Sequence, residues 1–382
     1  MTTSDTAVRR VTTPAGDPAW LITGYQNVKA LLSDPRLGRS HPQPERAARY
    51  SEAAIFGQAM GSPETERSDH AAMRALLTPS FSARRMANLR PRVQELVDGL
   101  LDDMSRMTPP LDVHAMLSLP LPVLVICELL GVPYVDREDF RCWSDDAADM
   151  RGGARSRAGL AQLQAYMAKL LERKRSSPAE DVLSDLVAAQ AYASAAFTDE
   201  GVAQLAAGLL FAGHETTVTA IDKGVILLLT NTDERDALQR DPSLLPRVVE
   251  EILRMPMPLS VSEHPTGPGG LPRYANADIE LGGATIAAGE LVLLDLQDAN
   301  LDSATFPSPE VFDVERVDNP HLTFGYGAHY CIGAPLARVE LQAVLGTLFR
   351  RFPTLRLAVS VEELRPRSQL LTGGVSSLPV TW

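Results

Sequence analysis

The stretch FGYGAHYCIGAPLAR, residues 324–338, decides how this 382-residue chain is interpreted. Two glycines precede Cys331 and Gly333 follows it, so the backbone can turn tightly and approach a flat ligand closely. The residues after the cysteine predict a helix over 332–351, and a helix N-terminus lowers the pKa of a thiol and offers N–H groups to a thiolate. A soft, anionic metal ligand needs such surroundings. A buried free cysteine before a helix would explain Cys331 alone, but not the whole spacing.

The rest of the composition narrows the class of protein. The net charge is −12 and the pI is near 5.1, which argues against nucleic acids and anionic membranes as partners. Cys127 lies in an apolar run and is predicted to be a core residue, while Cys142 receives no role, so the three cysteines form no disulfide framework. The N-terminus lacks an apolar signal core and no run of about 18 apolar residues occurs, so the sequence predicts a soluble, cytoplasmic protein.

Hydrophobic periodicity predicts a mainly α protein with a smaller β-rich region. A helix over 198–230 is apolar on all sides, and at some 30 residues it spans roughly 45 Å, so we expect it to run buried through the middle of the fold. Residues 34–66 lack periodicity, which is typical of a functional or mobile loop. The expected organisation is a single domain over residues 1–382, with β-rich parts at about 7–23 and 257–295 and helical parts at about 68–256 and 332–352.

The segment AGHETT, residues 212–217, lies in the middle of the predicted central helix. Gly213 and the two threonines are poor helix formers, and a threonine hydroxyl can bond to the carbonyl one turn earlier, so we expect a local widening of the helix. Glu215 is an acid among apolar residues, which is costly unless it has a partner or a task. In isolation the segment favours a capped kink with an exposed Glu215; beside the cysteine loop we interpret it as functional.

Two further pairs have helical spacing. Glu251 and Arg254, in EILR, lie three residues apart on one helix face, and His70 and Arg74 lie four apart. An exposed ion pair contributes little, and such spacings are common by chance. We interpret Glu251 and Arg254 as a structural pair. The paired N–H donors of an arginine suit a carboxylate, although a surface cation is the simpler explanation of Arg74 taken alone.

Together these segments resemble the cytochrome P450 family. Residues 324–338 match every fixed position of its haem-binding loop, F-G-x-G-x-H-x-C-x-G-x-x-L-A-R. Residues 212–217 match its A-G-x-[DE]-T-T segment, and 251–254 match its E-x-x-R motif. The resemblance extends over Ala19–Trp382 and implies the cytochrome P450 fold, with haem b as cofactor, Cys331 as the thiolate ligand of its iron and O2 as co-substrate.

The resemblance also assigns roles to individual residues. It implies that Thr216 hydrogen-bonds the dioxygen or its waters, that Glu215 relays protons from solvent, and that the Glu251–Arg254 pair packs beneath the haem loop. The residues implied to contact the haem, the first four at its propionates, are His70, Arg74, Arg273, His329, Phe324, Gly325, Gly333, Ala212 and Gly213. The residues expected in the substrate pocket are Ile55, Phe56, Met60, Leu209, Ala212 and Leu259.

The expected function is that of a haem-thiolate monooxygenase which hydroxylates or epoxidises a hydrophobic secondary metabolite, such as a polyketide, macrolide or terpenoid. The sequence has no Gly-rich dinucleotide-binding turn, so electrons are expected from a ferredoxin and its reductase. The ferredoxin is expected to dock on a monomer at a basic patch formed by Arg74, Arg84, Arg85, Arg338 and Arg350. Two alternatives stay open: oxidative rearrangement or coupling on the same haem, and a haem protein that binds a small gas or acts as a carrier without catalysis.

The chain departs from the family pattern in three places. Where members share A-N-R-D, residues 299–302 read ANLD, so Leu301 replaces an arginine. Residues 260–272 are unusually rich in proline and glycine, and the helix that usually precedes the first strands is absent or short. We expect these departures to affect the choice of substrate rather than the haem.

Overall fold

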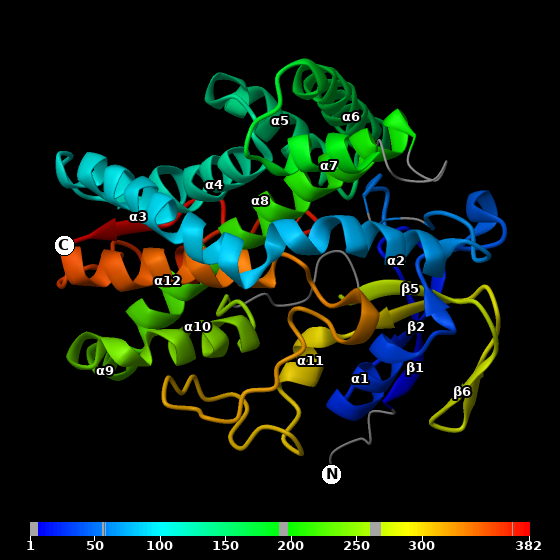
Figure 1. Ribbon diagram of the computed structural model, residues 1–382. Helices are drawn as coiled ribbons and strands as arrows, with labels where there is room; N and C mark the ends of the chain where they lie inside the picture. The colour runs from blue at the N-terminus through cyan, green and yellow to red at the C-terminus, as the bar shows by residue number, and fades with distance from the viewer. Residues whose placement is uncertain (1–6, 56, 58, 191–197, 260–268, 369) are drawn as a thin grey trace, which may run out of the picture.

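A computed structural model describes residues 7–55, 57, 59–190, 198–259, 269–368 and 370–382 of the chain. Figure 1 shows a large helical part and, at one side of it, a smaller part built on a sheet that contains β1, β2 and β5. This is the mainly α fold with a smaller β-rich region that the sequence predicts.

Helices and short strands follow one another along the described residues. The helices are α1 (Tyr25–Ser33), α2 (Glu66–Leu77), α3 (Ala83–Ser105), α4 (Pro120–Leu130), α5 (Arg137–Ala147), α6 (Gly153–Ser176), α7 (Val182–Gln190), α8 (Asp199–Thr230), α9 (Thr232–Arg240), α10 (Leu245–Arg254), α11 (Leu296–Asn300) and α12 (Ala334–Arg351). The strands are β1 (Val8–Thr12), β2 (Pro18–Ile22), β3 (Leu37–Gly38), β4 (Leu111–Asp112), β5 (Leu271–Ala275), β6 (Ile279–Leu281), β7 (Ala284–Ile286), β8 (Leu291–Leu294), β9 (Arg356–Leu357) and β10 (Pro379–Thr381).

The central helix α8 is the longest among the described residues. The Thr198 side chain accepts a hydrogen bond from the Gly201 N–H at 3.1 Å, and two acidic residues follow in the first turn, which together stabilise the N-terminus. Most of its side chains are buried, and α8 packs against α4, α6, α10 and α12. The prediction of a buried central helix is confirmed.

The widening predicted near residue 216 is not observed. Thr216 Oγ1 donates to the carbonyl oxygen of Ala212 at 2.9 Å, as expected, yet the helix is α-helical from Asp199 to Thr230. A carbonyl oxygen has two lone pairs, so it can accept the hydroxyl without giving up its backbone partner.

The main sheet joins the N-terminal strands to strands that lie between α10 and α11. Its order is β1-β2-β8-β5-β3, and β2 pairs parallel to β8 with Trp20 opposite Val292. The remaining pairs in this sheet are antiparallel. The strands predicted within 7–23 therefore share one sheet with β5 and β8, while β6 and β7 form a separate two-stranded sheet. The charge of Glu66, from α2, acts on Arg273 of β5, so this residue lies near the helical part.

The sequence also predicts short strands at residues 355–359 and 378–382, and these are confirmed as β9 and β10 of a second, three-stranded sheet, whose remaining strand, β4, was not predicted. Its order is β4-β10-β9, with Pro379 opposite Asp112, so the end of the chain pairs with a segment between α3 and α4. Asp112 Oδ1 also accepts a hydrogen bond from the Leu378 N–H at 2.7 Å. A strand of two residues has too few positions to show alternation, so periodicity assigns residues 111–112 to the helical part.

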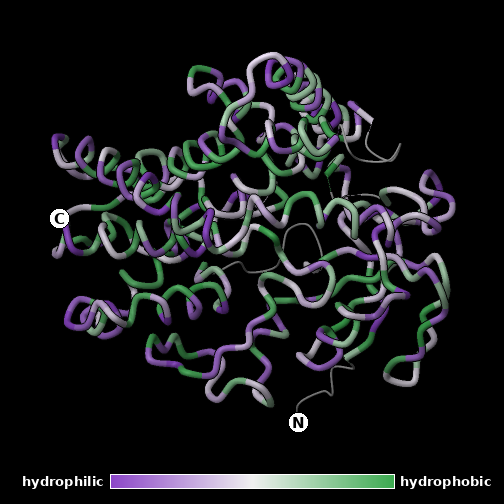
Figure 2. The backbone as a smooth tube through the Cα atoms, viewed as in Figure 1, coloured by the Kyte–Doolittle hydropathy of each residue, from purple (hydrophilic) through white to green (hydrophobic). Residues whose placement is uncertain are grey.

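Figure 2 shows hydrophobic stretches concentrated in the interior of the helical part and in the sheet, with hydrophilic stretches towards the outer helices. The core of the helical part includes Ile126 of α4, Leu210 of α8 and Leu345 of α12. No helix in the described part of the chain is both long and apolar enough to cross a bilayer.

Candidate active site

The loop that carries Cys331 folds back on itself. The Cys331 N–H donates to the Phe324 carbonyl oxygen at 2.8 Å, and Gly325 adopts φ = +72°, a left-handed conformation that favours glycine. The Phe324 ring packs under the Arg338 guanidinium, 4.7 Å from the ring centroid. A Cβ at Gly333 would lie 3.8 Å from Cys331 Sγ. The loop thus presents the sulfur from a closed turn.

Cys331 lies in the turn before α12, which begins at Ala334 rather than at the predicted residue 332. Part of the residue is accessible, but protein atoms surround the sulfur, and this desolvation raises the thiol pKa. The N–H groups of Gly333 and Ala334 and the charges of Arg74 and Arg338 act in the opposite direction. The predicted lowering by the helix N-terminus is therefore present but is outweighed by burial.

Basic side chains from α2 meet the cysteine loop. The rings of His70 and His329 lie 4.0 Å apart between centroids, and Arg74 Nη1 donates to the Tyr330 carbonyl oxygen at 2.9 Å. Burial, followed by the neighbouring cations, lowers the pKa of His70 and lowers that of His329 to about 4. The structure therefore brings together three of the residues that the sequence assigns to a propionate site.

Arg273 completes this basic cluster from the sheet. Its side chain is buried on β5, and Nη1 donates to the carbonyl oxygen of Pro272 at 2.8 Å. Burial, with the charge of Arg39, lowers the pKa of Arg273 to about 10. Glu66 is the nearby carboxylate, but its oxygens already accept hydrogen bonds from the N–H groups of Arg39 and Ser40. Arg39 and Glu66 are members of the site that sequence reasoning missed.

The chemistry of this donor set fits the cofactor that the sequence predicts. A thiol in a glycine-rich turn is a soft ligand suited to haem iron. Arg74 and the buried Arg273 carry two positive charges beside the single carboxylate of Glu66, and His70 and His329 add N–H donors, which suits the two propionates of a haem. The residues present therefore fit haem b.

One face of α8 is open although the rest of the helix is buried. The exposed residues Gln204, Gly208, Ala212 and Thr216 follow one another at intervals of four and therefore lie on a single stripe. Gly213 lies beside the stripe and faces α4, where a Cβ would lie 2.8 Å from Cδ1 of Ile126. The structure gives Gly213 a packing role, and its contact with the cofactor stays a prediction.

Glu215 points away from that open stripe and is fully buried. Its Oε2 accepts a hydrogen bond from Thr372 Oγ1 at 3.2 Å and lies 3.8 Å from Arg367 Nη2. Its Oε1 lies 3.5 Å from His214 Nδ1 and accepts no hydrogen bond from the part of the chain that the structure describes. Glu215 and Thr216 are adjacent in sequence but occupy different faces of the helix.

Glu251 and Arg254 form a buried pair rather than a surface pair. Arg254 donates through Nε and Nη2 to the two carboxylate oxygens of Glu251 at 2.8 and 2.6 Å. Arg316 Nε lies 3.1 and 3.2 Å from the same two oxygens, and Asn319 Nδ2 donates to Oε2 at 3.0 Å. Arg316 and Asn319 are a further part of this centre that the sequence did not reveal, because they lie more than 60 positions along the chain.

The same arginine fixes the segment that leads to the cysteine loop. Arg254 donates to the carbonyl oxygens of Asn300, Pro309 and Val311 at 3.0, 2.6 and 3.1 Å. These bonds satisfy backbone groups in a stretch with little regular structure. Leu301, which replaces the family's arginine, is half-buried directly after α11.

The residues predicted for the substrate pocket occupy different environments. Met60 is exposed and its sulfur accepts a hydrogen bond from Arg39 Nη2 at 3.0 Å, which places it beside the basic cluster. Ile55 is buried, and Leu209 and Leu259 are partly buried against the helical core. Phe56 lies outside the described residues.

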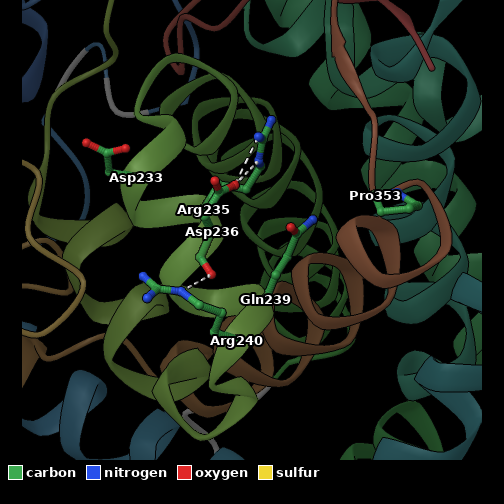
Figure 3. Close-up of a pocket in the computed structure, with 6 residues that line it drawn as sticks. All are labelled: Asp233, Arg235, Asp236, Gln239, Arg240 and Pro353. Atoms are coloured by element: carbon green, nitrogen blue, oxygen red, sulfur yellow. Dashed lines mark hydrogen bonds and ion pairs between the residues drawn. The ribbon is translucent and has the colours of Figure 1, made fainter.

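A charged hollow of about 600 Å³ lies at the surface over α9, and Figure 3 shows the residues that line it. Within it Asp236 accepts a hydrogen bond from Arg235 Nη2 at 3.0 Å through its carboxylate and from Arg240 Nε at 3.2 Å through its carbonyl oxygen. None of the predicted site residues lines it.

Comparisons with known proteins agree with this geometry. The family model for cytochrome P450 matches residues 156–373. The chain is 43% identical over 375 residues to pentalenolactone synthase of Streptomyces exfoliatus, covering 96% of this chain and 91% of that one. It is 40% identical over 378 residues to the mycinamicin IV hydroxylase/epoxidase of Micromonospora griseorubida, covering 98% and 92%. A crystal structure of SgvP, a putative thioether synthase in the tailoring of griseoviridin, has a TM-score of 0.89 at 38% identity, covering 99% and 94%.

Proposed function

The chain belongs to the cytochrome P450 family of haem-dependent monooxygenases, and from this membership we propose that it oxidises a hydrophobic secondary metabolite with electrons from a ferredoxin. Haem b held by a cysteine thiolate activates O2 in this family. The observation that carries the proposal is that the Cys331 loop contacts the basic cluster of His70, Arg74, Arg273 and His329.

We assign the haem contacts from this arrangement. Cys331 is the thiolate ligand, in a turn where Phe324, Gly325 and Gly333 keep the backbone close to the sulfur. The two propionates would be bound by His70, Arg74, Arg273 and His329, because each carries N–H donors and the two arginines are positively charged. Ala212 is exposed on the open stripe of α8, where it would contact the cofactor.

Glu215 and Thr216 share the delivery of protons. Thr216 lies on the open stripe, where its hydroxyl oxygen can accept a hydrogen bond from a water, or can donate to a reacting oxygen once it releases the Ala212 carbonyl oxygen. Glu215 is buried behind it and keeps one carboxylate oxygen without a hydrogen bond from the described residues, so it can take up and release a proton through water. General acid catalysis of this kind contributes about 10²- to 10⁴-fold to a rate.

The substrate class is inferred from relatives and from the pocket residues. One relative is a hydroxylase/epoxidase of mycinamicin IV, and the residues predicted for the pocket of this chain are apolar. We propose hydroxylation or epoxidation of a polyketide, macrolide or terpenoid. Oxidative coupling or rearrangement is the second candidate, because SgvP is assigned to the synthesis of a thioether, a bond that carries no inserted oxygen.

The electron donor is proposed to bind near the cysteine loop of a cytoplasmic monomer. Within the predicted basic patch, Arg85 pairs with Asp185 at 3.3 Å and Arg338 with Glu250 at 2.7 Å, while Arg84 and Arg350 are exposed. Replacing Arg350 by Glu is expected to raise the KM for ferredoxin severalfold. That effect should shrink as salt screens the contact.

The central test is a carbon monoxide difference spectrum of the reduced protein. The wild type and Cys142→Ala are expected to show the red-shifted Soret band of thiolate ligation, and Cys331→Ala is expected to lose it. An unshifted band in the wild type would overturn the assignment of the ligand. Substrates are then sought by metabolite-induced shifts of the Soret band, and product mass under labelled O2 distinguishes oxygen insertion from coupling.

A further inference from the structure

The buried acid Glu215 belongs to a cluster assembled from three parts of the chain. Asp145 comes from α5, Glu215 and His214 come from α8, and Arg367 and Thr372 come from the segment after β9. The proposed function gives Glu215 a task, but it does not say how a fully buried carboxyl group regains a proton after each reaction.

One nitrogen atom of Arg367 lies close to two carboxylates, those of Asp145 and Glu215. Arg367 Nη2 lies 3.3 Å from Asp145 Oδ1 and 3.8 Å from Glu215 Oε2. Arg141 adds a second cation at the outer side, with Nη1 3.1 Å from Asp145 Oδ2. Two carboxylates that face one another across a single guanidinium nitrogen favour a state in which one of them carries a proton.

Solvent reaches this cluster through Asp145 rather than Glu215. The Asp145 side chain is 25% exposed, whereas the Glu215 side chain is 0% exposed. A proton from bulk water therefore meets Asp145 first. Burial and the nearby Glu215 both raise the pKa of Asp145, partly opposed by Arg367, so Asp145 holds a proton more readily than an ordinary aspartic acid does.

His214 is a poor alternative donor, although its Nδ1 lies 3.5 Å from Glu215 Oε1. The ring is fully buried, and neither nitrogen has a hydrogen-bond partner in the described residues. Burial lowers the pKa of His214 to about 4, so the ring is neutral at physiological pH and is cut off from solvent.

We propose that Asp145 is a relay residue that returns a proton to Glu215 in each turnover, and that Arg367 positions the two carboxyl groups for this transfer. The Asp145 carboxylic acid releases its proton to the Glu215 carboxylate, and Asp145 then takes a replacement from bulk water. The inference rests on the proposed function, because it needs Glu215 to consume a proton. Asp145 acts through Glu215 and does not touch the reacting atoms.

The first experiment compares two oxidants on the holoenzyme. Turnover driven by ferredoxin and reductase draws protons from the protein, whereas hydrogen peroxide brings its own. With 7-ethoxycoumarin as the probe, Asp145→Asn is expected to lower reductant-driven turnover about tenfold, to increase the solvent isotope effect and to leave peroxide-driven turnover unchanged. Asp146→Asn is the matched control, since Asp146 is the next residue of α5 and pairs with Arg155 instead.

Equal losses with both oxidants, or no loss with either, would overturn the relay. A merely structural role for Asp145 predicts the first of these results. A wild type that oxidises neither this probe nor any metabolite, with either oxidant, would count against the proposed function instead.

The second experiment does not depend on turnover. The ionisation of Asp145 is followed by carboxyl ¹³C NMR of labelled aspartate in the holoprotein. The charged or titratable groups that face Asp145 are Glu215 and His214 of α8, Arg367, Arg141 of its own helix and Arg155 of α6. The Asp145 pKa is expected to be raised in the wild type and to fall towards its ordinary value in Glu215→Gln. An unchanged pKa in that variant would show that the two carboxyl groups are not coupled and would refute the proposal.

Discussion

Glu251 and Glu215 are both fully buried glutamates on core helices, yet their surroundings differ. Both oxygens of Glu251 receive charged or neutral N–H donors, from Arg254, Arg316 and Asn319. Glu215 has a hydroxyl at 3.2 Å, a cation at 3.8 Å and one oxygen without a hydrogen bond from the described residues. A carboxylate whose lone pairs are all occupied can only support structure, whereas one with a free lone pair can also accept a proton.

The largest expected effect is a loss of stability when Glu251, whose two oxygens are fully hydrogen-bonded, is replaced. Glu251→Gln leaves Arg254 and Arg316 buried without an anion, so we expect a loss of about 3–5 kcal/mol in the free energy of unfolding, and little folded holoprotein. Urea unfolding and the haem content after purification measure this. Glu95→Gln, which removes an exposed i,i+3 partner of Arg92, is the control and should change stability by less than about 1 kcal/mol. If the Glu251→Gln holoprotein kept wild-type stability, the contrast between the two glutamates would disappear.

The opposite pattern is expected at Glu215. Glu215→Gln removes the titrating group but leaves no cation stranded at close range, so stability should change by less than about 1 kcal/mol. Reductant-driven turnover should fall about 100-fold, which corresponds to about 2.7 kcal/mol. Peroxide-driven turnover should be retained. A large loss of stability without this separation of the two oxidants would place Glu215 in the same structural class as Glu251.

Asp222 of α8 is an intermediate case, because one oxygen is paired and the other is not. Its Oδ2 lies 2.7 Å from His114 Nδ1, while Oδ1 lacks a hydrogen bond from the described residues. Burial lowers the pKa of His114, but the hydrogen bond and charge of Asp222 outweigh burial, so the net pKa is raised. A base with a raised folded-state pKa stabilises the fold below its unfolded pKa of about 6.5, and this contribution is lost as pH rises through the folded-state value.

His114→Gln should therefore lower the free energy of unfolding more at pH 6 than at pH 9. The loss at pH 6 is expected to exceed the loss at pH 9 by about 1–2 kcal/mol. Urea unfolding at both pH values checks this sign. His41→Gln, at a histidine that forms no ion pair within the described part of the chain, should show no such difference. A penalty that grows with pH would mean that the pair is not charged in the folded state.

The smallest expected effect comes from the hydroxyl that binds Glu215. Thr372→Val removes the donor to Oε2 while preserving the shape of the side chain. One hydrogen bond contributes about 1 kcal/mol, so reductant-driven turnover should change by about fivefold or less, and the free energy of unfolding by about 1 kcal/mol or less. Thr219→Val removes a hydroxyl of α8 that donates to the Thr372 carbonyl oxygen at 3.4 Å, and it tests whether the segment rather than the hydroxyl matters. Equal effects of both changes would favour the segment.

The difference between Glu251 and Glu215 also shows which contacts could be predicted from the sequence. Local spacing places Cys331 in its turn and Arg254 beside Glu251, because motif members a few residues apart keep a fixed geometry on a helix or loop. The cost of an acid in an apolar helix predicts that Glu215 has a task or a partner. Its partners Asp145 and Arg367 lie 70 and 152 positions away, and an isolated aspartate on an amphipathic helix gives no signal of its own. The two-residue strand β4 escaped detection because it is too short to show alternation and its partner is more distant still, with Pro379 lying 267 positions after Asp112.

The pairing of β10 with β4 has a consequence for the order in which the enzyme becomes competent. The ribosome delivers Cys331 before Arg367 and Thr372, and the last strand lies later still. During synthesis, Cys331 is therefore available before Arg367 and Thr372, the residues that contact Glu215. Arg367 and Thr372 lie between β9 and β10, and β10 pairs with both β9 and β4, so this sheet holds in place the segment that contacts Glu215.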